Sequence, residues 1–280
     1  MTRGEPEAIR PVPDASCLSL AGWRAFTALA EQNLAGAREE IDALNVYPVR
    51  DHDTGTNMFL TVQAARAALL EAVDAGEAER VALRAFARGA LLGARGSSGV
   101  IVSQLFGALV RHLVDAPSGV EPGQVLADGL VAAAEAGYAA VGDPAEGTIL
   151  SVVGAASRAA ASAAGTQGLA EILSAAATAA REALARTPEQ LPVLARAGVV
   201  DAGGCGLCVL LEAAETAVTG RRAVGGPPAL GARAIPEPRG PVDRLAADGP
   251  AYEVMFLLDA DDAAIPALRV TLAPLGDSMV

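Results

Sequence analysis

The 280-residue chain contains no lysine and only two histidines, so arginine supplies almost all of its positive charge. Without lysine there can be no Walker-type phosphate loop, because that loop uses a lysine to contact the nucleotide phosphates. A bound polyphosphate would therefore have to be neutralised by metal ions, arginine or backbone N–H groups. The formal net charge of −12 also argues against nucleic acid as a partner, since an acidic surface repels phosphate backbones.

Aromatic residues make up 3% of the chain, whereas 52% of its residues are hydrophobic, mainly Ala, Leu and Val. This composition favours closely packed helices over a sandwich or barrel of short strands. The three cysteines, Cys17, Cys205 and Cys208, do not form a disulfide framework. No signal-peptide-like run opens the chain, and no charge-free apolar segment reaches the ~20 residues that a membrane span requires. We therefore expect a mostly helical, cytoplasmic protein without a membrane span.

Apolar residues recur with helical spacing in eight long segments and in a shorter one near 188–197. The turns between these segments are of two alternating kinds. One kind is plain, and the other is rich in Gly, Thr, Ser and Asp: RDHDTGTN, GARGSSG, GDPAEGT and DAGGCG. The predicted long helices cover residues 19–44, 56–76, 78–94, 98–115, 123–141, 147–164, 168–186 and 205–219.

The polar turns follow one another at intervals of roughly 45 to 55 residues, the length of one helix down and another back. All four turns should therefore lie at the same end of an up-and-down helical bundle, and each opens a helix at its N-terminus. Helix N-termini concentrate unpaired N–H groups and positive dipole ends. This end of the bundle is therefore suited to an anionic ligand.

Composition divides the chain into three parts. Residues 1–220 contain the predicted helices, and residues 221–250 are rich in Pro and Gly without periodicity, as in a linker. Residues 251–280 have the pattern of a strand, a helix and the beginning of a second strand. That segment is too short to close a core. We expect it to be the start of a truncated α/β domain, with an edge that is either mobile or paired with another copy.

Asp51 and Asp53 are two residues apart in an irregular turn, where both carboxylates can face one divalent cation. An EF-hand loop is excluded, because Gly55 and Val62 stand where two of its ligands belong. A site with few protein carboxylates suits Mg²⁺, which keeps several waters and shares substrate phosphates. The structural alternative is that Asp53 caps the following helix and Asp51 is merely solvated.

The C-x-x-C formed by Cys205 and Cys208 stands at a predicted helix start, where a thiolate would be stabilised. A zinc site would have to recruit His52 and His112 from distant parts of the chain, and no thioredoxin-like pattern surrounds the pair. Buried small side chains are therefore the favoured interpretation. His112 is expected to be structural, and His52 is either a candidate base or a neighbour of the metal ligands.

Four segments, in this order and at these intervals, carry a family resemblance: LNVYPVRDHDTGTNM, GARGSSGVIVSQ, EGTILSVV and AGVVDAGGCGL. Together they resemble the nucleotide-binding DhaL (DAK2) domain, specifically the N-terminal domain of bacterial fatty acid kinases, over residues 15–220. The resemblance implies an all-α barrel of eight antiparallel up-and-down helices, which binds ADP or ATP with two Mg²⁺ ions at one rim. Residues 252–280 resemble the opening of that family's middle domain.

The resemblance assigns metal binding to Asp51 and Asp53, and Asn45 is the nearest equivalent of a further metal-binding aspartate in the glycerone kinase branch. His52 replaces the usual glycine between the two aspartates, and Ser97 and Cys205 stand where fatty acid kinases often have Asn and Gln. The implied nucleotide-binding residues are Thr54, Gly55, Thr56, Asn57, Ser97 and Ser98 along the phosphates, Thr148 and Ile149 beside the adenine, and Asp201, Ala202 and Gly203 on the nucleotide's far side.

The implied reaction transfers the γ-phosphate of ATP to the carboxylate of a fatty acid held by a separate DegV-like carrier protein (FakB), giving an acyl phosphate. That carboxylate is already anionic at neutral pH, so no general base is needed, and no catalytic residue is assigned beyond the metal and phosphate site. Two alternatives stay open: a glycerone (dihydroxyacetone) kinase-like subunit, and a regulatory module that binds ADP and Mg²⁺ without turnover. A homodimer also stays open.

Overall fold

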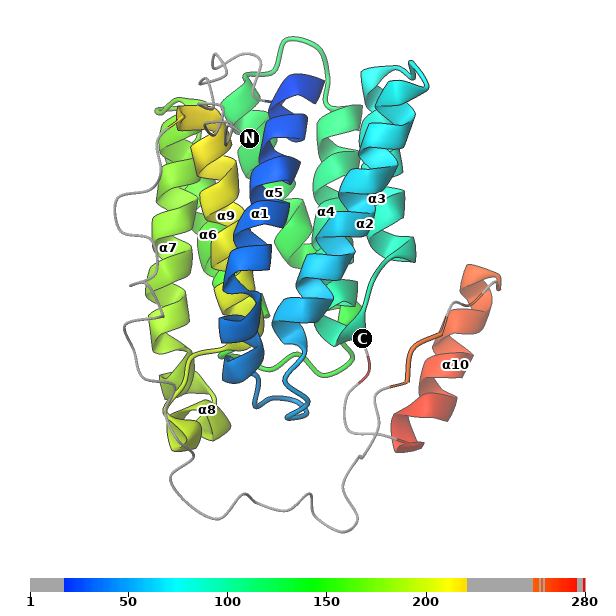
Figure 1. Ribbon diagram of the computed structural model, residues 1–280, viewed down its shortest axis with the longest axis vertical. Helices are drawn as coiled ribbons and strands as arrows, with labels where there is room; N and C mark the ends of the chain where they lie inside the picture. The colour runs from blue at the N-terminus through cyan, green and yellow to red at the C-terminus, as the bar shows by residue number, and fades with distance from the viewer. Residues whose placement is uncertain (1–17, 221–253, 257, 259, 276–278, 280) are drawn as a thin grey trace, which may run out of the picture.

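The computed structural model describes residues 18–220, 254–256, 258, 260–275 and 279. Within residues 18–220 it contains eight long helices and the short helix α8 (Pro192–Ala197) (Figure 1). No strand occurs among the described residues, which confirms the all-α prediction for this part of the chain. The long helices are α1 (Leu20–Leu44), α2 (Thr54–Asp74), α3 (Glu79–Leu92), α4 (Gly96–Asp115), α5 (Pro122–Ala140), α6 (Ile149–Ala163), α7 (Leu169–Gln190) and α9 (Ala202–Thr219).

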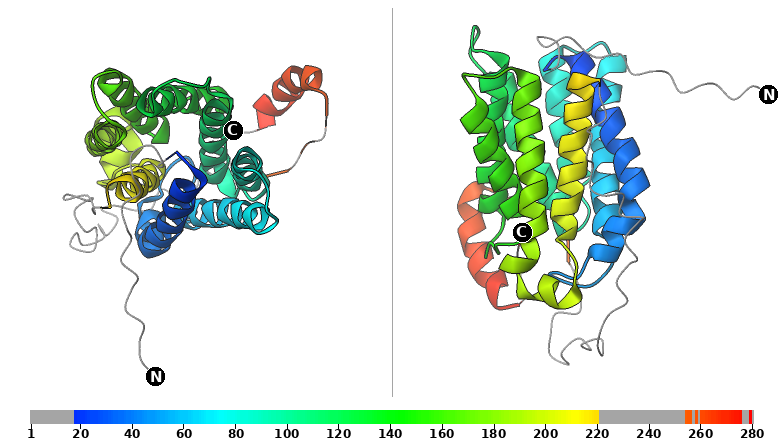
Figure 2. Two further views of the ribbon diagram at one scale, coloured as in Figure 1. Left: turned by 90° about the horizontal axis from the view of Figure 1, so that it is seen from above. Right: turned by 90° about the vertical axis from the view of Figure 1, so that its left-hand side faces the viewer.

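The long helices form a closed ring. Each of α1 to α7 packs against its neighbours along the chain, α7 packs against α9, and α9 returns to α1. Viewed along their axes, the helices surround a common interior (Figure 2, left). Because successive long helices run in opposite directions, every second turn lies at the same end of the ring (Figure 1).

Helix α7 extends further than its periodicity predicts, to Gln190, and it contains Pro188. A proline inside a helix removes one N–H donor and leaves the carbonyl four residues earlier without its partner. Here that carbonyl belongs to Leu184, and the hydroxyl of Thr187 donates a hydrogen bond to it at 2.7 Å. The threonine thus replaces the missing donor, and the helix continues through the proline.

Buried aromatic rings join three helices of the ring. Phe86 of α3 lies between Trp23 of α1 and Phe106 of α4, with ring centroids 5.0 Å apart in each pair. An apolar cavity of ≈ 110 Å³ lies beside these rings, in the half of the ring away from the polar turns, and residues of α1, α4, α5, α6, α7 and α9 line it. Apolar contact therefore holds this half of the ring together.

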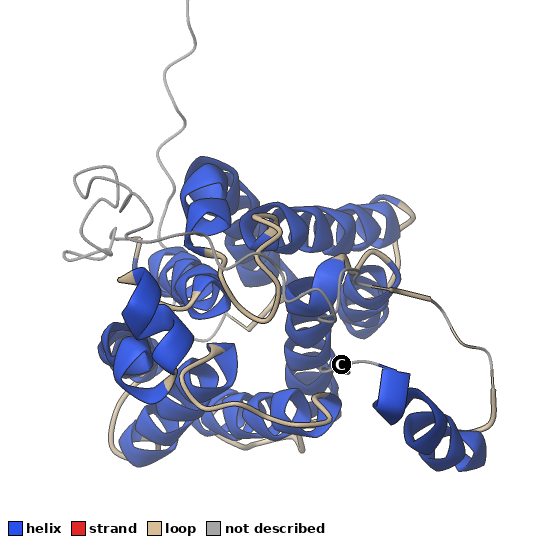
Figure 3. Cartoon of the chain, turned by 90° about the horizontal axis from the view of Figure 1, so that it is seen from below, coloured by secondary structure: helices blue, strands red, loops and turns tan. Residues whose placement is uncertain are grey.

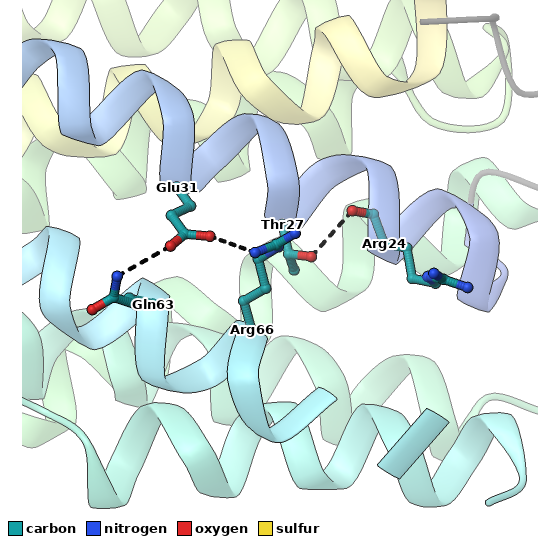
Figure 4. Close-up of polar contacts among 5 residues, drawn as sticks. All are labelled: Arg24, Thr27, Glu31, Gln63 and Arg66. Atoms are coloured by element: carbon teal, nitrogen blue, oxygen red, sulfur yellow. Dashed lines mark hydrogen bonds and ion pairs between the residues drawn. The ribbon is translucent and has the colours of Figure 1, made fainter. Parts of the chain in front are cut away.

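Polar contacts between α1 and α2 lie on the outside of the ring (Figure 4). The carboxylate of Glu31 accepts hydrogen bonds from Gln63 Nε2 at 3.2 Å and from Arg66 Nη1 at 2.7 Å. The side chains of this ion pair are 22% and 33% exposed, and such pairs contribute only about 0–1 kcal/mol. The stability of the α1–α2 pair therefore comes mainly from the buried face.

By length and composition alone, two of the described helices, α4 and α9, could cross a membrane. Both belong to the ring, and 44% and 72% of their apolar windows are buried inside it. Each also carries charged residues, such as Arg111 in α4 and Glu212 in α9. Their apolar faces thus pack against neighbouring helices.

Beyond the ring, the described residues include α10 (Ile265–Leu272), flanked by two short 3₁₀ turns, η3 (Asp262–Ala264) and η4 (Ala273–Leu275). None of the described side chains of α10 is buried. The helix predicted in residues 251–280 is present, and the described residues of the predicted strand, 254–256 and 258, are not in a strand. The remainder of that strand, the linker and Cys17 lie outside the described residues.

Phe86 offers a test of this packing. Its side chain is 0% exposed, so Phe86→Ala should leave a cavity and lower the free energy of unfolding by about 3–5 kcal/mol. Leu92 on the same helix is 49% exposed, and Leu92→Ala should change that free energy by less than about 0.5 kcal/mol. Urea denaturation followed by circular dichroism measures both, and equal effects would contradict the assigned core.

Candidate functional site

The structure places all four polar turns at the same end of the ring (Figures 1 and 3). Contacts join the helix starts there. The hydroxyl of Thr61 in α2 accepts a hydrogen bond from Arg95 N, just before α4, at 3.2 Å. A Cβ at Gly206 of α9 would overlap the sulfur of Met58 in α2, so these helices approach closely. The starts of α2, α4 and α9 are thus held as neighbours.

The remaining polar turn, between α5 and α6, meets the same group. Burial raises the pKa of Tyr47, in the turn before α2, and the nearby charges of Asp143 and Asp201 raise it further. Asp143 belongs to the α5–α6 turn, and Asp201 immediately precedes α9. The turn before α2 therefore lies close to both of the other turns.

Asp53 stands at the N-cap position of α2 but makes no side-chain capping hydrogen bond. The bond is made instead by Asp42, which lies in the last turn of α1. Its Oδ1 accepts from Thr56 N at 2.9 Å, and its Oδ2 accepts from the Thr56 hydroxyl at 2.7 Å. The alternative in which Asp53 caps its own helix is therefore wrong, because another carboxylate already occupies the donor.

Acidic groups lie around Asp53, which makes no capping bond. Burial raises the pKa of its carboxyl group, a hydrogen bond with Asn57 lowers it, and the neighbouring charges of Asp51 and Asp42 raise it again. The Asn45 side chain is 3% exposed and donates from Nδ2 to Asp51 Oδ1. Its Oδ1 is buried without a hydrogen-bond partner. Two carboxylates in mutual repulsion beside an unpartnered amide oxygen form an oxygen-rich site that suits a hard cation.

Among the described residues, no three His, Cys, Asp or Glu side chains converge in a way that could hold a metal ion on their own. Asp42 lies nearby, but Thr56 takes both of its oxygens. Only Asp51, Asp53 and Asn45 are left. This donor set fits a cation that keeps water or shares a ligand's oxygens, as Mg²⁺ does, better than one enclosed by protein.

His52, between the two aspartates, has a φ of 58°. This left-handed conformation costs most residues about 1–2 kcal/mol and is free for glycine, which explains why glycine is the usual residue in the motif that the sequence resembles. The exposed imidazole lies with Nδ1 3.2 Å from the carbonyl oxygen of Asp42. The histidine thus adopts a turn conformation that ordinarily favours glycine.

The residues predicted along the phosphates lie at the starts of α2 and α4. A Cβ at Gly55 would overlap the carbonyl oxygen of Arg38, so only glycine fits between α2 and α1. Thr56 cannot offer a free donor, since Asp42 takes both its N–H and its hydroxyl. Thr54 and Asn57 are buried, whereas Ser97 and Ser98, in the first turn of α4, are partly exposed.

Asp201 connects the starts of α6 and α9. Its Oδ2 accepts from Gly204 N at 2.7 Å, and its carboxylate also bonds to the backbone of Ile149. Asp201 N donates to Thr187 Oγ1 at 3.1 Å, which adds α7 to the assembly. The carboxylate of Asp201, which was predicted to lie on the nucleotide's far side, therefore bonds to backbone groups.

The other residues predicted near the base share this corner. Thr148 caps α6, accepting from Leu150 N at 3.3 Å, and its hydroxyl donates to Ala145 O at 2.8 Å. Ile149 and Ala202 are buried, and Gly203 is partly exposed. A Cβ at Gly203 would lie 3.2 Å from Ile149 Cβ, so the two helix starts nearly touch.

Sequence reasoning missed several residues that shape the site. Asp42 gave no local signal, because its partner is fourteen residues away. Glu146 belongs to the EGT segment, but the segment alone does not indicate its hydrogen-bond partners. It accepts hydrogen bonds from Tyr138 at 3.0 Å and from Ser151 at 2.6 Å, and Ser151 in turn accepts from Gly147 N. This network fixes the turn before α6.

The cysteines behave differently from the thiolate expectation. Cys205 and Cys208 are free and buried, and burial raises the pKa of Cys205 to about 12 and raises that of Cys208 as well. Burial outweighs any stabilisation by the helix start, because both thiols lie among apolar side chains. Their role as small buried side chains agrees with the favoured interpretation.

Residues 48–216 match the sequence profile of the DAK2 domain, and the chain belongs to this family. It is 40% identical over 194 residues to uncharacterized proteins of Staphylococcus aureus strains bovine RF122 / ET3-1 and USA300. The aligned region covers 68% of this chain and 34% of those proteins, so the chain spans about a third of their length. A solved structure, the dihydroxyacetone kinase of C. freundii in its native form, shares 20% identity at a TM-score of 0.48, covering 76% of this chain and 36% of that one.

Asp201 provides a prediction about pH. Burial raises its pKa from 3.8 to about 6, so its contribution to stability is fully present below 3.8 and is lost as the pH rises through about 6. This difference corresponds to roughly 3 kcal/mol. Asp201→Asn keeps an acceptor of similar capping strength but does not titrate. On lowering the pH from 7 towards 4, the wild type should therefore gain up to roughly 3 kcal/mol on the variant.

Urea denaturation at a series of pH values measures this difference. Thr148→Ser is the control, since it keeps a capping hydroxyl at the same corner and introduces no titrating group. Its stability should follow the wild-type pH curve. Parallel curves for the wild type and Asp201→Asn would contradict the assigned titration.

Proposed function

We propose that this chain is the ATP-binding part of a fatty acid kinase, which transfers the γ-phosphate of Mg-ATP to the carboxylate of a carrier-bound fatty acid. Membership of the DAK2 domain family supports a kinase-related nucleotide domain. One observation carries the proposal furthest. Asp53 makes no capping bond. It lies beside Asp51 and the unpartnered oxygen of Asn45, where helix N-termini meet.

The residues that would hold the metal are Asp51 and Asp53, with Asn45 beside them. Mg²⁺ bound there would offset the negative charge shared by the aspartates and the phosphates. This role matters in a chain without lysine, because the carboxylates at this end would otherwise repel a polyphosphate.

The ends of the helices have separate roles in the proposal. The N-cap residue of α4, Arg95, makes no side-chain capping bond, and Ser97 and Ser98 in the first turn are partly exposed, so this end can face phosphate oxygens. The starts of α6 and α9 are capped by Thr148 and Asp201, with Ile149 buried and Gly203 partly exposed beside them. They suit the uncharged base. The nucleotide would thus lie across the end of the ring.

The reaction requires no further catalytic group from this chain. An oxygen of the fatty acid carboxylate attacks the γ-phosphorus, the bond between that phosphorus and the β,γ-bridging oxygen breaks, and ADP leaves with the electron pair. No proton has to be removed from the nucleophile. The chain's contribution is to hold the phosphates in line and to keep their counter-charges fixed.

The test combines the complete natural polypeptide with Mg-ATP and follows ADP formation. ADP release that requires a DegV-like carrier loaded with fatty acid supports the fatty acid kinase. Release with dihydroxyacetone instead of the carrier supports a glycerone kinase-like subunit. Mg-ADP binding without turnover under either condition supports a regulatory module, and absence of binding overturns the nucleotide assignment.

Asp53→Ala tests the metal assignment separately. Calorimetry in the presence of Mg²⁺ should show ADP affinity weakened by about 100-fold or more, since a direct ligand matters at least as much as its supporting residues. Helicity should be unchanged, because Asp53 makes no capping bond. Asp74→Ala is the control, as this exposed aspartate ends the same helix at the opposite end of the ring. Unaltered ADP affinity in Asp53→Ala would refute the metal role.

A further inference from the structure

Asp42 touches the segment around Asp53 on both sides. Its carboxylate binds the N–H and the hydroxyl of Thr56, three residues after Asp53, at 2.9 Å and 2.7 Å. Its carbonyl oxygen lies 3.2 Å from Nδ1 of His52, the residue just before Asp53. One residue of α1 therefore brackets a candidate metal ligand that lies eleven positions further along the chain.

The bond to Thr56 is the one that Asp53 would ordinarily make. An N-cap side chain accepts from the N–H of the second or third helical residue, and Thr56 is the third residue of α2. Its N–H is directed to Asp42, and its hydroxyl is bound there as well. Asp53 has no capping bond and bonds to Asn57 instead, with Asp51 as its charged neighbour.

Close packing holds Asp42 in this position. A Cβ placed on Gly55 would overlap the carbonyl oxygen of Arg38. It would lie 2.9 Å from Ile41 Cβ and 3.0 Å from Asp42 Oδ1. No side chain fits there, so the first turn of α2 rests directly on the last turn of α1. The register of the two helices is thus fixed, and Asp42 reaches Thr56 without any rearrangement.

We propose that Asp42 is a positioning residue, which caps α2 from the neighbouring helix and thereby keeps the Asp53 carboxylate available for a cation. Loss of Asp42 frees the Thr56 N–H, and Asp53 can then turn to cap its own helix. That movement takes its carboxylate away from Asp51 and from the unpartnered Asn45 oxygen. The metal role of Asp53 rests on the proposed function. The exchange of caps, in which Asp53 replaces Asp42 as the cap of α2, does not.

The exchange of caps is tested without metal or nucleotide by a double-mutant cycle on thermal unfolding. In the wild type, Asp53→Ala should leave the Tm unchanged or raise it. The substitution removes a carboxylate that makes no capping bond and is repelled by neighbouring carboxylates. In the Asp42→Ala background, the same substitution should lower the Tm, because Asp53 is then the cap. An effect of the same sign and size in both backgrounds would overturn the exchange.

Calorimetry with Mg-ADP tests the consequence for binding. Asp42→Ala should weaken affinity by about 10- to 100-fold, as expected for loss of a group that orients a metal ligand. Asp42→Asn should restore most of it, since an amide oxygen can accept from the Thr56 N–H. Glu39→Ala removes an exposed charge from the same turn of α1 and should bind as the wild type does.

The two proposals fail in different ways. A wild-type chain that does not bind Mg-ADP overturns the proposed function, while the unfolding cycle still decides whether Asp42 holds the cap. Wild-type affinity in Asp42→Ala, in a protein that binds Mg-ADP normally, overturns the positioning role alone. Failure of Asp42→Asn to recover affinity would also overturn it, because capping from α1 would then not be what the site requires.

Discussion

The end of the ring that carries the polar turns depends on one requirement: the N–H groups that begin each helix need acceptors. In this chain, carboxylates supply several of them, and one of these carboxylates lies on a neighbouring helix. Asp42 in α1 serves α2, and Asp201 serves both α9 and α6. The bonds from Asp42 to Thr56 and from Asp201 to Ile149 each join two helices, so satisfying these backbone groups also fixes how the helix starts lie relative to one another.

This way of capping has an electrostatic consequence. Each cap brings a negative charge to the end of the ring, and Asp51 and Asp53 add two more. Burial raises the pKa values of Asp53 and Asp201, and the nearby charges of Asp51 and Asp42 raise that of Asp53 further, so the charges there are not fully compensated. A polyphosphate would be repelled by this surface unless a divalent cation arrived with it. In the proposed function, anion binding is thus coupled to metal binding, which accords with a chain that has no lysine.

The helices could be predicted from the sequence because their apolar residues repeat with a period of 3.6 over many turns. The extension of α7 through Pro188 could not, since it depends on the Thr187 hydroxyl replacing an absent N–H group. The positions of the polar turns followed from helix lengths alone. The structural alternative, in which Asp53 caps α2, was wrong for a physical reason: local sequence shows only the nearest acceptor, whereas the structure brings Asp42 from another helix.

The two ends of the ring are packed differently, with glycines between helix starts at one end and apolar side chains around a cavity at the other. At the polar end, Gly55 lets the start of α2 approach α1 until no side chain fits between them, and Gly206 of α9 leaves room for the side chain of Met58 from α2. At the other end, Trp23 and its aromatic neighbours leave an apolar cavity of ≈ 110 Å³. Close backbone contact leaves little freedom to shift, whereas side chains around a cavity can repack. The packing therefore leaves less freedom to the start of α2 at the polar end than to the side chains around the cavity.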